Sequence, residues 1–264
     1  MNRLLVTGAG GRLGSVLRPH LATLARARRL SDIIAIEDAT PEEEYVACDL
    51  SDFAAVRALV EGCDGIIHLG GIATEDSFDR LLSGNIIGTY HVYEAARQAG
   101  VNRVFLASSN HATGYHSTET MLDADAGFRP DSLYGATKVW SESIATLYHD
   151  KFGIETARVR IGSCWPRPNT ARELKTWLSH GDLVRLVQCV FRVPELGCPV
   201  IYAVSDNAGC WWDNSKVAYL GWAPQDSADT FREEFPDADL PLNESDPSQM
   251  YQGGTFAAAG HFED

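Results

Sequence analysis

RLLVTGAGGRLG, residues 3–14, is a short apolar run that passes directly into a glycine-rich loop. Residues 3–7 are apolar and end at a glycine, as a buried strand of a parallel sheet does. Gly8, Gly11 and Gly14 follow, with two residues between successive glycines. Glycines let backbone N–H groups approach a pyrophosphate, and the helix that begins there adds partial positive charge. The stretch predicts a strand, loop and helix that bind a dinucleotide; the alternative is a tight turn without a ligand.

Apolar runs and helical patterns alternate from this stretch onward. Strands are expected at 3–7, 32–36, 65–71, 103–109 and 155–163, and helices at 11–29, 52–61, 85–100 and from before Tyr134 to about Phe152. This strict alternation predicts an α/β fold, a Rossmann-type doubly wound parallel sheet with helices on both faces. Right-handed crossovers would align the strand C-termini along one edge of the sheet, where ligands bind.

The rhythm breaks after residue 163. Two prolines precede a short helix, residues 182–193 have an amphipathic helical pattern, and 198–205 read as a late strand. We expect a dinucleotide-binding core over residues 1–163. We expect a small substrate-binding lobe over residues 164–264, interleaved with the last sheet elements.

Composition limits the possible partners and compartment. The chain has 264 residues, of which 22% are charged, and a net charge of −14. Such a surface repels phosphate backbones, so nucleic acid is not an expected partner. No C-x-x-C pair occurs among the six cysteines, and no apolar run reaches the length of a signal peptide or a membrane span. We expect a cytoplasmic protein with reduced thiols and no membrane partner.

The acidic residues after the second expected strand bear on cofactor choice. A carboxylate at the end of that strand accepts hydrogen bonds from a ribose 2′-hydroxyl and repels a 2′-phosphate. Asp38 is the first choice and Glu37 the second, because the end of the strand is uncertain by a residue or two. This predicts NAD rather than NADP. Arg12 in the glycine loop argues the other way, since an arginine there can hold a 2′-phosphate.

In SLYGATKVW, residues 132–140, Tyr134 and Lys138 are four residues apart with small residues between them. On a helix these positions lie on one face, which the small residues leave open to a ligand. A charge interaction of about 4 kcal/mol corresponds to about three pKa units, so a nearby ammonium would favour the phenolate. Tyr134 could then take a hydroxyl proton as hydride leaves the carbon. A surface pair without function is the alternative.

Six strings, in order and at sensible spacings, carry a family resemblance: TGAGGRLG (7–14), CDL (48–50), HLGG (68–71), GNIIGTYHVYEAAR (84–97), LASSN (106–110) and YGATK (134–138). Together they resemble the extended short-chain dehydrogenase/reductase superfamily, also called the NAD-dependent epimerase/dehydratase superfamily. The resemblance covers about residues 1–163. One departure is that the V-Y-G usual in the family after the serine motif appears here as NHATGY.

The resemblance implies an NAD-binding Rossmann core with a catalytic group of Ser109, Tyr134 and Lys138, supported by Asn85. Ser108 is a close alternative to Ser109, and Asn85 has an alternative reading as a helix cap or buried amide. The cofactor-binding residues implied are Gly8, Gly11, Arg12, Leu13, Gly14, Asp38, Asp49, Leu50, Leu69, Gly70, Gly71, Asn85, Ser108, Tyr134, Lys138, Ile161 and Ser163.

Further strings, among them LGGIATE (69–75), SSNHATGYH (108–116), VRIGSCWPRPN (159–169), AGCWWDNS (208–215) and QGGTF (252–256), resemble the uronate dehydrogenases of that superfamily. This resemblance implies oxidation of D-glucuronate or D-galacturonate at C1 by NAD to the aldarolactone, without a metal. The substrate-binding residues implied are Ser109, Asn110, His111, Tyr134, Ser163, Arg172, which would bind the C6 carboxylate, and Phe256, which would close the pocket.

Several alternatives stay open. Arg172 has a plain reading as a solvated helix residue and His111 as a loop histidine, while Trp211 and Trp212 read as core aromatics. The rival functions are a nucleotide-sugar epimerase or dehydratase that retains its NAD, and a non-catalytic NAD-binding scaffold. The superfamily's common dimer interface predicts a homo-oligomer. The sequence does not rank glucuronate against galacturonate.

Overall fold

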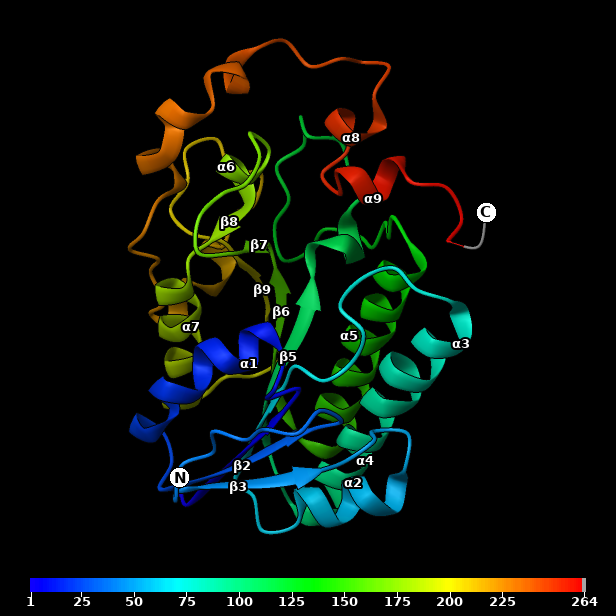
Figure 1. The fold of residues 1–264 in the computed structure, drawn as a ribbon, viewed down its shortest axis with the longest axis vertical. Helices are drawn as coiled ribbons and strands as arrows, with labels where there is room; N and C mark the ends of the chain where they lie inside the picture. Colours follow the sequence, from blue (N-terminus) through cyan, green and yellow to red (C-terminus); the bar gives the residue numbers. More distant parts are fainter. Residues whose placement is uncertain (263–264) are drawn as a thin grey trace. The chain divides into compact units, whose positions relative to one another are not determined.

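A computed structural model describes residues 1–262 of the chain (Figure 1). Its strands are β1 (Arg3–Thr7), β2 (Ala27–Asp32), β3 (Glu43–Ala47), β4 (Gly65–His68), β5 (Arg103–Ser109), β6 (Glu155–Ile161), β7 (Ser163–Cys164), β8 (Trp177–Leu178) and β9 (Val200–Ala203). Seven of them form one sheet in the order β3-β2-β1-β4-β5-β6-β9, and β7 pairs with β8. The pairs β1·β2, β1·β4, β2·β3 and β4·β5 are parallel. The predicted Rossmann-type doubly wound sheet is confirmed.

The α-helices are α1 (Arg12–Leu17), α2 (Phe53–Val60), α3 (Phe78–Leu81), α4 (Gly88–Ala99), α5 (Leu133–Phe152), α6 (Glu173–Thr176), α7 (His180–Arg192), α8 (Pro247–Met250) and α9 (Thr255–Ala258). A π-helical turn, η2 (Leu82–Ile87), leads into α4, and 3₁₀ turns occur at η1 (Arg18–Thr23), η3 (Asn110–Thr113), η4 (Ser215–Leu220), η5 (Ala228–Glu234) and η6 (Pro236–Asp239). None of the helices described is both long and apolar enough to cross a membrane.

The described residues divide by their internal contacts into two compact units. Unit 1 contains residues 1–107, 140–158 and 194–198, and unit 2 contains residues 108–139, 159–193 and those from 199 onward. This division follows packing and not function, so the boundary expected between residues 163 and 164 stays a prediction.

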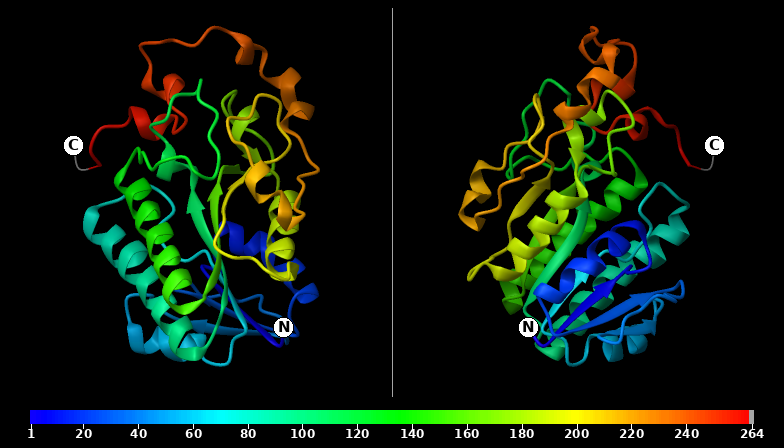
Figure 2. Two further views of the ribbon diagram at one scale, coloured as in Figure 1. Left: turned by 180° about the vertical axis from the view of Figure 1, so that it is seen from behind. Right: turned by 60° about the vertical axis from the view of Figure 1, so that its left-hand side comes forward.

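In unit 1 the parallel strands lie between α1 on one face and α2 with α4 on the other (Figure 1; Figure 2). A core of fully buried apolar side chains, including Ile66, Val92, Tyr93 and Val104, fills the space between the sheet and α4. Burying side chains of this size contributes about 1.5–3 kcal/mol each. The core fixes the sheet, and with it the loops at the C-terminal ends of the strands.

Two expected elements of unit 1 are wrong. The helix expected at 11–29 is α1, which ends at Leu17 because Pro19 lacks the N–H that would continue it, and the 3₁₀ turn η1 follows to Thr23. The second strand is 27–32 and not 32–36, and Ile33 and Ile34 are 76% and 64% exposed. The sequence does not predict a strand at 27–32, because Arg28 and Arg29 interrupt the apolar pattern of a buried strand.

Those arginines are buried through specific partners. The Arg29 guanidinium donates to the Glu44 carboxylate at 2.9 Å and to the Leu59 and Glu61 carbonyls at 2.8 and 2.9 Å. A buried charge is tolerated when it is paired and hydrogen-bonded in this way. Glu44 lies on β3, a strand that the sequence did not predict.

Unit 2 has its own apolar clusters. Trp211 and Trp212 are buried beside Leu122, Tyr202 and Val204, and the Trp212 ring stacks on Tyr202 with centroids 5.3 Å apart. The reading of both tryptophans as core aromatics is confirmed. The amphipathic helix expected at 182–193 is α7, and the late strand is β9.

Candidate active site

Tyr134 and Lys138 lie in the first two turns of α5, on one face as predicted. Both are buried, with 6% and 9% exposure, and the Lys138 ammonium nitrogen is 5.4 Å from the centroid of the Tyr134 ring. The helix start is held by the Ser132 hydroxyl, which accepts from the Gly135 N–H at 2.9 Å. A Cβ on Gly135 would lie 2.4 Å from the His111 carbonyl oxygen, so glycine permits this close approach. The pair is a buried one and not a surface pair.

Ser109, the last residue of β5, brings its hydroxyl to Tyr134. The Ser109 hydroxyl also accepts from the His111 N–H at 3.2 Å, which caps η3. Burial raises the pKa of Tyr134 to about 12, and the hydrogen bond with Ser109 acts in the opposite direction. Loss of solvent is the largest effect on this phenol, so the lowering expected from Lys138 together with the oxidised nicotinamide stays a prediction for the cofactor-bound protein.

His111 lies between two rings and a carboxylate. Its ring stacks on Phe256 with centroids 4.0 Å apart and meets the Tyr134 ring edge-on at 5.8 Å. Its Nδ1 is 2.8 Å from the Asp131 carboxylate. The structure therefore brings together Ser109, His111, Tyr134 and Phe256, four residues that the sequence assigned to one site.

Arg172 immediately precedes α6 and is partly buried. Its guanidinium donates through Nη2 to the Gln252 carbonyl and lies over the Trp211 ring, 5.8 Å from the centroid. Its Nε is shielded from solvent and has no hydrogen-bond partner among the described residues. Burial lowers the pKa of Arg172 from its usual value. The reading of Arg172 as a solvated helix residue is wrong.

A second unpartnered donor is found in the same unit. Asn110 is 7% exposed, and within the described chain its Nδ2 is buried without a hydrogen-bond partner. Buried polar groups are nearly always hydrogen-bonded, so each exception calls for an explanation. Two such donors on residues assigned to the substrate indicate a site for a ligand with polar acceptor atoms.

The remaining residues predicted in unit 2 lie on β5, β6 and the short strand β7. Ser108 and Ile161 are buried, at 3% and 9% exposure. The Ser163 hydroxyl lies 3.0 Å from the Thr176 hydroxyl, across the pairing of β7 with the chain entering β8.

The glycine loop in unit 1 is shaped by close backbone approach. Gly8 has φ +69°, and a Cβ there would lie 2.7 Å from the backbone nitrogen of Gly70. At Gly14 a Cβ would lie 2.5 Å from the Ala9 carbonyl oxygen. The Gly11 N–H donates to the Gly8 carbonyl at 3.1 Å, while Arg12 and Leu13 begin α1. Only glycine fits at Gly8 and Gly14, as a dinucleotide-binding turn requires.

The acidic residue at the end of β2 is Asp32. Its carboxylate accepts from the Gly10 N–H at 2.9 Å and from the Ile34 N–H at 3.2 Å. Asp38 lies six residues further along, 83% exposed in its side chain, and pairs with Arg18 at 2.8 Å. The strand assignment that selected Asp38 is wrong, because the strand ends earlier than the apolar run DIIAI suggested.

Asn85 lies in η2 and is 2% exposed. Its carboxamide accepts from the Ile72 N–H at 2.7 Å and donates to the Ile72 carbonyl at 3.0 Å, which fixes the loop after β4. Gly71, in that loop, has φ +130°, and a Cβ there would lie 2.7 Å from the Asn85 oxygen. Asn85 is a buried amide that shapes the loop, and its catalytic role stays a prediction.

The other cofactor residues expected in unit 1 follow β4 and β3. Thr7 accepts from the Gly70 N–H at 3.2 Å, next to Leu69. The Asp49 carboxylate accepts from the Ser51 N–H at 2.9 Å, which lowers the pKa of Asp49, and a Cβ on Gly70 would contact Leu50.

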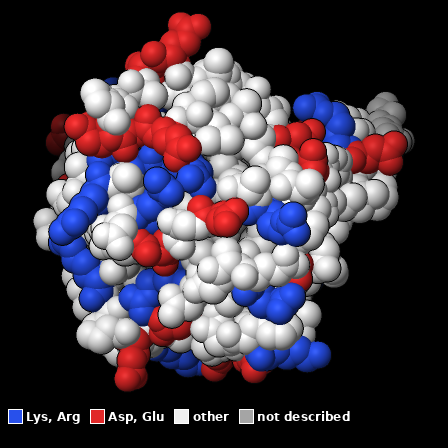
Figure 3. Space-filling view, turned by 90° about the horizontal axis from the view of Figure 1, so that it is seen from below, with Lys and Arg blue, Asp and Glu red and all other residues white. Residues whose placement is uncertain are grey.

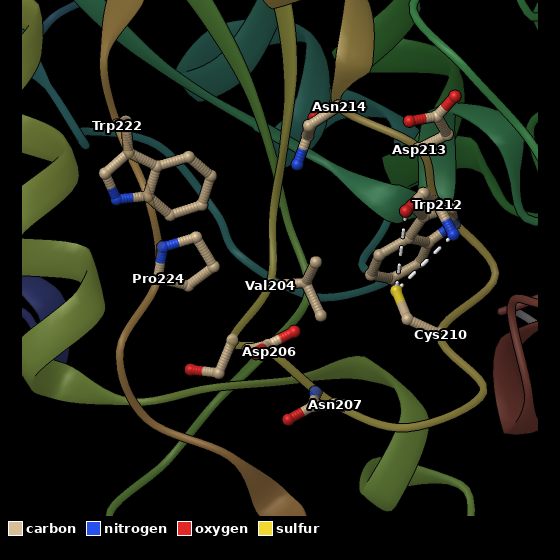
Figure 4. Close-up of a pocket in the computed structure, with 10 residues that line it drawn as sticks. Val204, Asp206, Asn207, Cys210, Trp212, Asp213, Asn214, Trp222 and Pro224 are labelled. Atoms are coloured by element: carbon tan, nitrogen blue, oxygen red, sulfur yellow. Dashed lines mark hydrogen bonds between the residues drawn. The ribbon is translucent and has the colours of Figure 1, made fainter. Parts of the chain in front are cut away.

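A cavity of about 180 Å³ lies elsewhere in unit 2 (Figure 4). Trp212, Trp222, Asp206, Asn207 and Asn214 are among its lining residues, and the predicted site residues are not. The Asn207 and Asn214 amides already bond the Trp177 and Tyr202 backbones. Within residues 1–262 no three His, Cys, Asp or Glu side chains are grouped to hold a metal ion.

Sequence reasoning missed three residues that hold the glycine loop, His111 and Arg172 in place. Asp32 was read as the start of a strand, and Asp131 had only its place three residues before Tyr134 as a signal. Gln252 opens the QGGTF string, which was quoted only for its resemblance. Each acts through contacts between distant segments, for which the sequence carries no local pattern.

Comparisons with known proteins agree with this geometry. Residues 4–166 match the pattern of the NAD dependent epimerase/dehydratase family. A uronate dehydrogenase from Agrobacterium fabrum is 52% identical over 256 residues, 97% of each chain. The crystal structure of a glucuronic acid dehydrogenase from Chromohalobacter salexigens has a TM-score of 0.97 at 52% identity, covering 100% of this chain and 99% of that one. A mutant uronate dehydrogenase from Agrobacterium tumefaciens, complexed with NAD, has a TM-score of 0.95 at 51% identity, covering 99% of each chain.

Proposed function

The chain belongs to the NAD dependent epimerase/dehydratase family, and we propose that it oxidises a uronic acid, D-glucuronate or D-galacturonate, at C1 with NAD. The product is the aldarolactone, because removing a hydride from C1 and a proton from its hydroxyl converts a cyclic hemiacetal into a ring ester. The relatives of similar length that carry the names uronate dehydrogenase and glucuronic acid dehydrogenase support this assignment.

The residues of unit 1 fit NAD. The glycine turn leaves backbone space that a Cβ at Gly8 or Gly14 would fill, and this space suits a pyrophosphate. We place the ribose 2′-hydroxyl on Asp32, whose carboxylate ends β2. When bound, NAD accepts the hydride that leaves C1. Apart from Asp38, which Asp32 replaces, the residues that the sequence predicts around the cofactor, from Arg12 and Leu13 to Ile161, remain part of this proposal.

The chemistry falls to residues at the start of α5 and the end of β5. Tyr134 accepts the proton of the C1 hydroxyl as the C–H bond breaks, and Ser109 hydrogen-bonds the same oxygen. Lys138 binds the ribose next to the nicotinamide, and its charge stabilises the phenolate as it forms. The Ser109 hydrogen bond, which already favours the ionised form of Tyr134, supports this assignment.

One observation carries the substrate class: Arg172 is a partly buried cation whose described hydrogen bond goes to a carbonyl and whose Nε is unpartnered. A buried guanidinium is stable when an anion pairs with it, and a carboxylate accepts two parallel N–H bonds from it. We therefore place the C6 carboxylate of the sugar acid on Arg172. Neutral aldoses lack this group.

The hydroxyls of the sugar have polar partners in the same unit. Asn110 offers its unpartnered Nδ2, while Ser163 and His111 add a hydroxyl and an imidazole. Phe256 packs on His111 and closes the pocket on that side.

A panel of sugars with NAD tests the function. We expect NADH to form with D-glucuronate and D-galacturonate, and not with the matching aldoses glucose and galactose. Epimerised UDP-sugar without net NADH would instead identify a nucleotide-sugar epimerase. If NADH binds but no sugar acid is oxidised, the protein is a scaffold and the proposal is wrong.

Replacing Arg172 tests the carboxylate site. Loss of a charged hydrogen bond costs about 1.5–3 kcal/mol, so Arg172→Ala should raise KM for the uronate by about 10- to 100-fold and leave KM for NAD unchanged. Arg167→Ala is the matched control, because Arg167 pairs with Glu234 on the surface. Unchanged uronate kinetics in Arg172→Ala would remove the assignment.

A further inference from the structure

Asp131 is a buried carboxylate that contacts His111, a residue of the candidate active site. Its side chain is fully buried, at 0% exposure. One carboxylate oxygen lies 2.8 Å from His111 Nδ1, and the other accepts from the Ser132 hydroxyl at 2.9 Å. Its backbone N–H donates to the His111 carbonyl at 3.4 Å. A buried carboxylate is costly unless it is hydrogen-bonded, so its contact with His111 is part of what keeps it there.

Two glycines from distant parts of the chain leave room for this carboxylate. A Cβ on Gly114 would lie 1.7 Å from the Asp131 oxygen that faces His111, and a Cβ on Gly253 would lie 1.8 Å from it. The two segments are joined by a hydrogen bond of 2.8 Å from the Gly253 N–H to the Gly114 carbonyl. Alanine at either position would push the carboxylate away from the imidazole.

The imidazole is held on its other sides as well. Phe256 stacks on one face, Tyr134 meets an edge, and 15% of the side chain remains exposed. Because a carboxylate only accepts hydrogen bonds, Nδ1 must carry the proton that points at Asp131. In the neutral ring Nε2 is then an acceptor, and among the described residues it has no hydrogen-bond partner.

We propose that Asp131 is a positioning residue of the active site, which fixes His111 in the tautomer with its proton on Nδ1 so that Nε2 accepts a hydrogen bond from a hydroxyl of the bound sugar. The proposal rests on the proposed function for the identity of the sugar. It adds that binding of the sugar depends on the tautomer of His111 and not only on the presence of its imidazole ring. Asp131 acts through His111 and does not touch the reacting atoms.

Asp131→Asn is the sharpest variant, because it keeps the shape of the side chain. The Ser132 hydroxyl continues to donate to the carboxamide oxygen, which places the amide NH₂ against His111 Nδ1. Nδ1 must then accept, the proton moves to Nε2, and the sugar hydroxyl loses its acceptor. We expect KM for the uronate to rise about 10- to 100-fold, with KM for NAD unchanged.

Asp182→Asn is the matched control for damage to the fold. Asp182 is also fully buried in unit 2, where it bonds Arg185 and Ser205, and it is not part of the proposed site. It should lower stability without raising KM for the uronate. A double-mutant cycle with His111→Ala tests whether Asp131 acts through His111. If it does, Asp131→Asn should have no further effect on kcat/KM once the His111 imidazole is removed. Equal losses in both backgrounds would overturn the proposal.

Nitrogen-15 NMR of histidine-labelled protein gives a readout independent of turnover. His111, assigned by its absence in His111→Gln, should show a protonated Nδ1 and an unprotonated Nε2 in the wild type. Its Nε2 resonance should move on addition of D-glucuronate. The opposite tautomer in wild type overturns the proposal even if Asp131→Asn does not fold. If the wild type fails to oxidise uronate, the proposed function falls, while the tautomer still decides whether Asp131 orients the ring.

Discussion

At Tyr134 two effects act in opposite directions on one proton. Burial raises the pKa of the phenol to about 12, and the Ser109 hydrogen bond lowers it because the hydroxyl stabilises the phenolate. Oxidation requires Tyr134 to accept a proton, so the rate should increase with pH as the phenol ionises.

Ser109→Ala removes the effect that lowers this pKa. The pKa of Tyr134 should therefore rise, and the pH at which kcat is half-maximal should move upward, together with a loss of kcat of about 100-fold. Ser109→Thr, which keeps a hydroxyl, is the control and should retain more of the wild-type profile. A pH–rate profile of kcat measures this, and a downward or absent shift would show that Ser109 does not stabilise the phenolate.

The residues proposed to bind substrate could largely be predicted from the sequence, and the residues that hold them in place could not. Tyr134 and Lys138 are four residues apart on one helix, a local pattern that the chain itself displays. Asp131 and Gln252 gain their roles from His111 and Arg172, which are 20 and 80 residues away. Such contacts depend on tertiary packing. The same holds for the burial of Tyr134, which raises the pKa of its phenol.

At the scale of elements, the position of β2 decides which carboxylate we propose as the partner of the cofactor ribose. β2 ends at Asp32, which also holds the glycine loop through the Gly10 N–H. A carboxylate near a 2′-phosphate repels it by about 4 kcal/mol at 4 Å and an effective dielectric of about 20. Asp32→Asn should therefore raise the ratio of kcat/KM for NADP to that for NAD by at least about tenfold.

Asp38→Asn is the matched control, because the sequence predicts Asp38 for this role and the structure pairs it with Arg18 instead. It should leave the cofactor ratio unchanged. If the ratio of kcat/KM for NADP to that for NAD changes in Asp38→Asn and not in Asp32→Asn, Asp38 and not Asp32 binds the ribose.

Most elements could be predicted, and the failures have physical causes. β1, β5 and α7 follow from apolar runs and an amphipathic repeat. β2 was not predicted, because its two buried arginines read as part of a polar helix. The exposed Ile33 and Ile34 that follow it gave the apolar pattern of a strand. β3 reads EEYVA, with two charges at its start. Ion pairs between strands, such as Arg29 with Glu44, change the side-chain preferences of a strand without leaving a periodic signal.

At the scale of the whole molecule, charge is the dominant property. The net charge is −14, although Lys and Arg side chains are interspersed with Asp and Glu on the face drawn in Figure 3. Self-repulsion of this size destabilises the compact state, and salt screens it. Raising NaCl from about 10 mM to about 150 mM, which shortens the Debye length from about 30 Å to about 8 Å, should raise Tm by a few degrees.

The control is the same salt step near pH 4.9, the sequence pI, where little net charge remains and Tm should move less. Calorimetry at the two pH values compares the shifts. A fall in Tm with salt at neutral pH would mean that surface pairs such as Lys216 with Asp123 contribute more than repulsion. The expected homo-oligomer and the functional boundary at residue 163 stay predictions, because neither follows from one chain's contacts.

The segment from Gln252 to Phe256 supplies the carbonyl that holds Arg172 and the ring that packs on His111. Deleting residues 252–256 would remove both contacts at once, while the glycine loop in unit 1 would keep its own contacts, so we expect sugar recognition to be lost with the nucleotide loop intact. Substitutions or insertions between residues 252 and 256 should therefore be treated as changes to the proposed sugar-binding site.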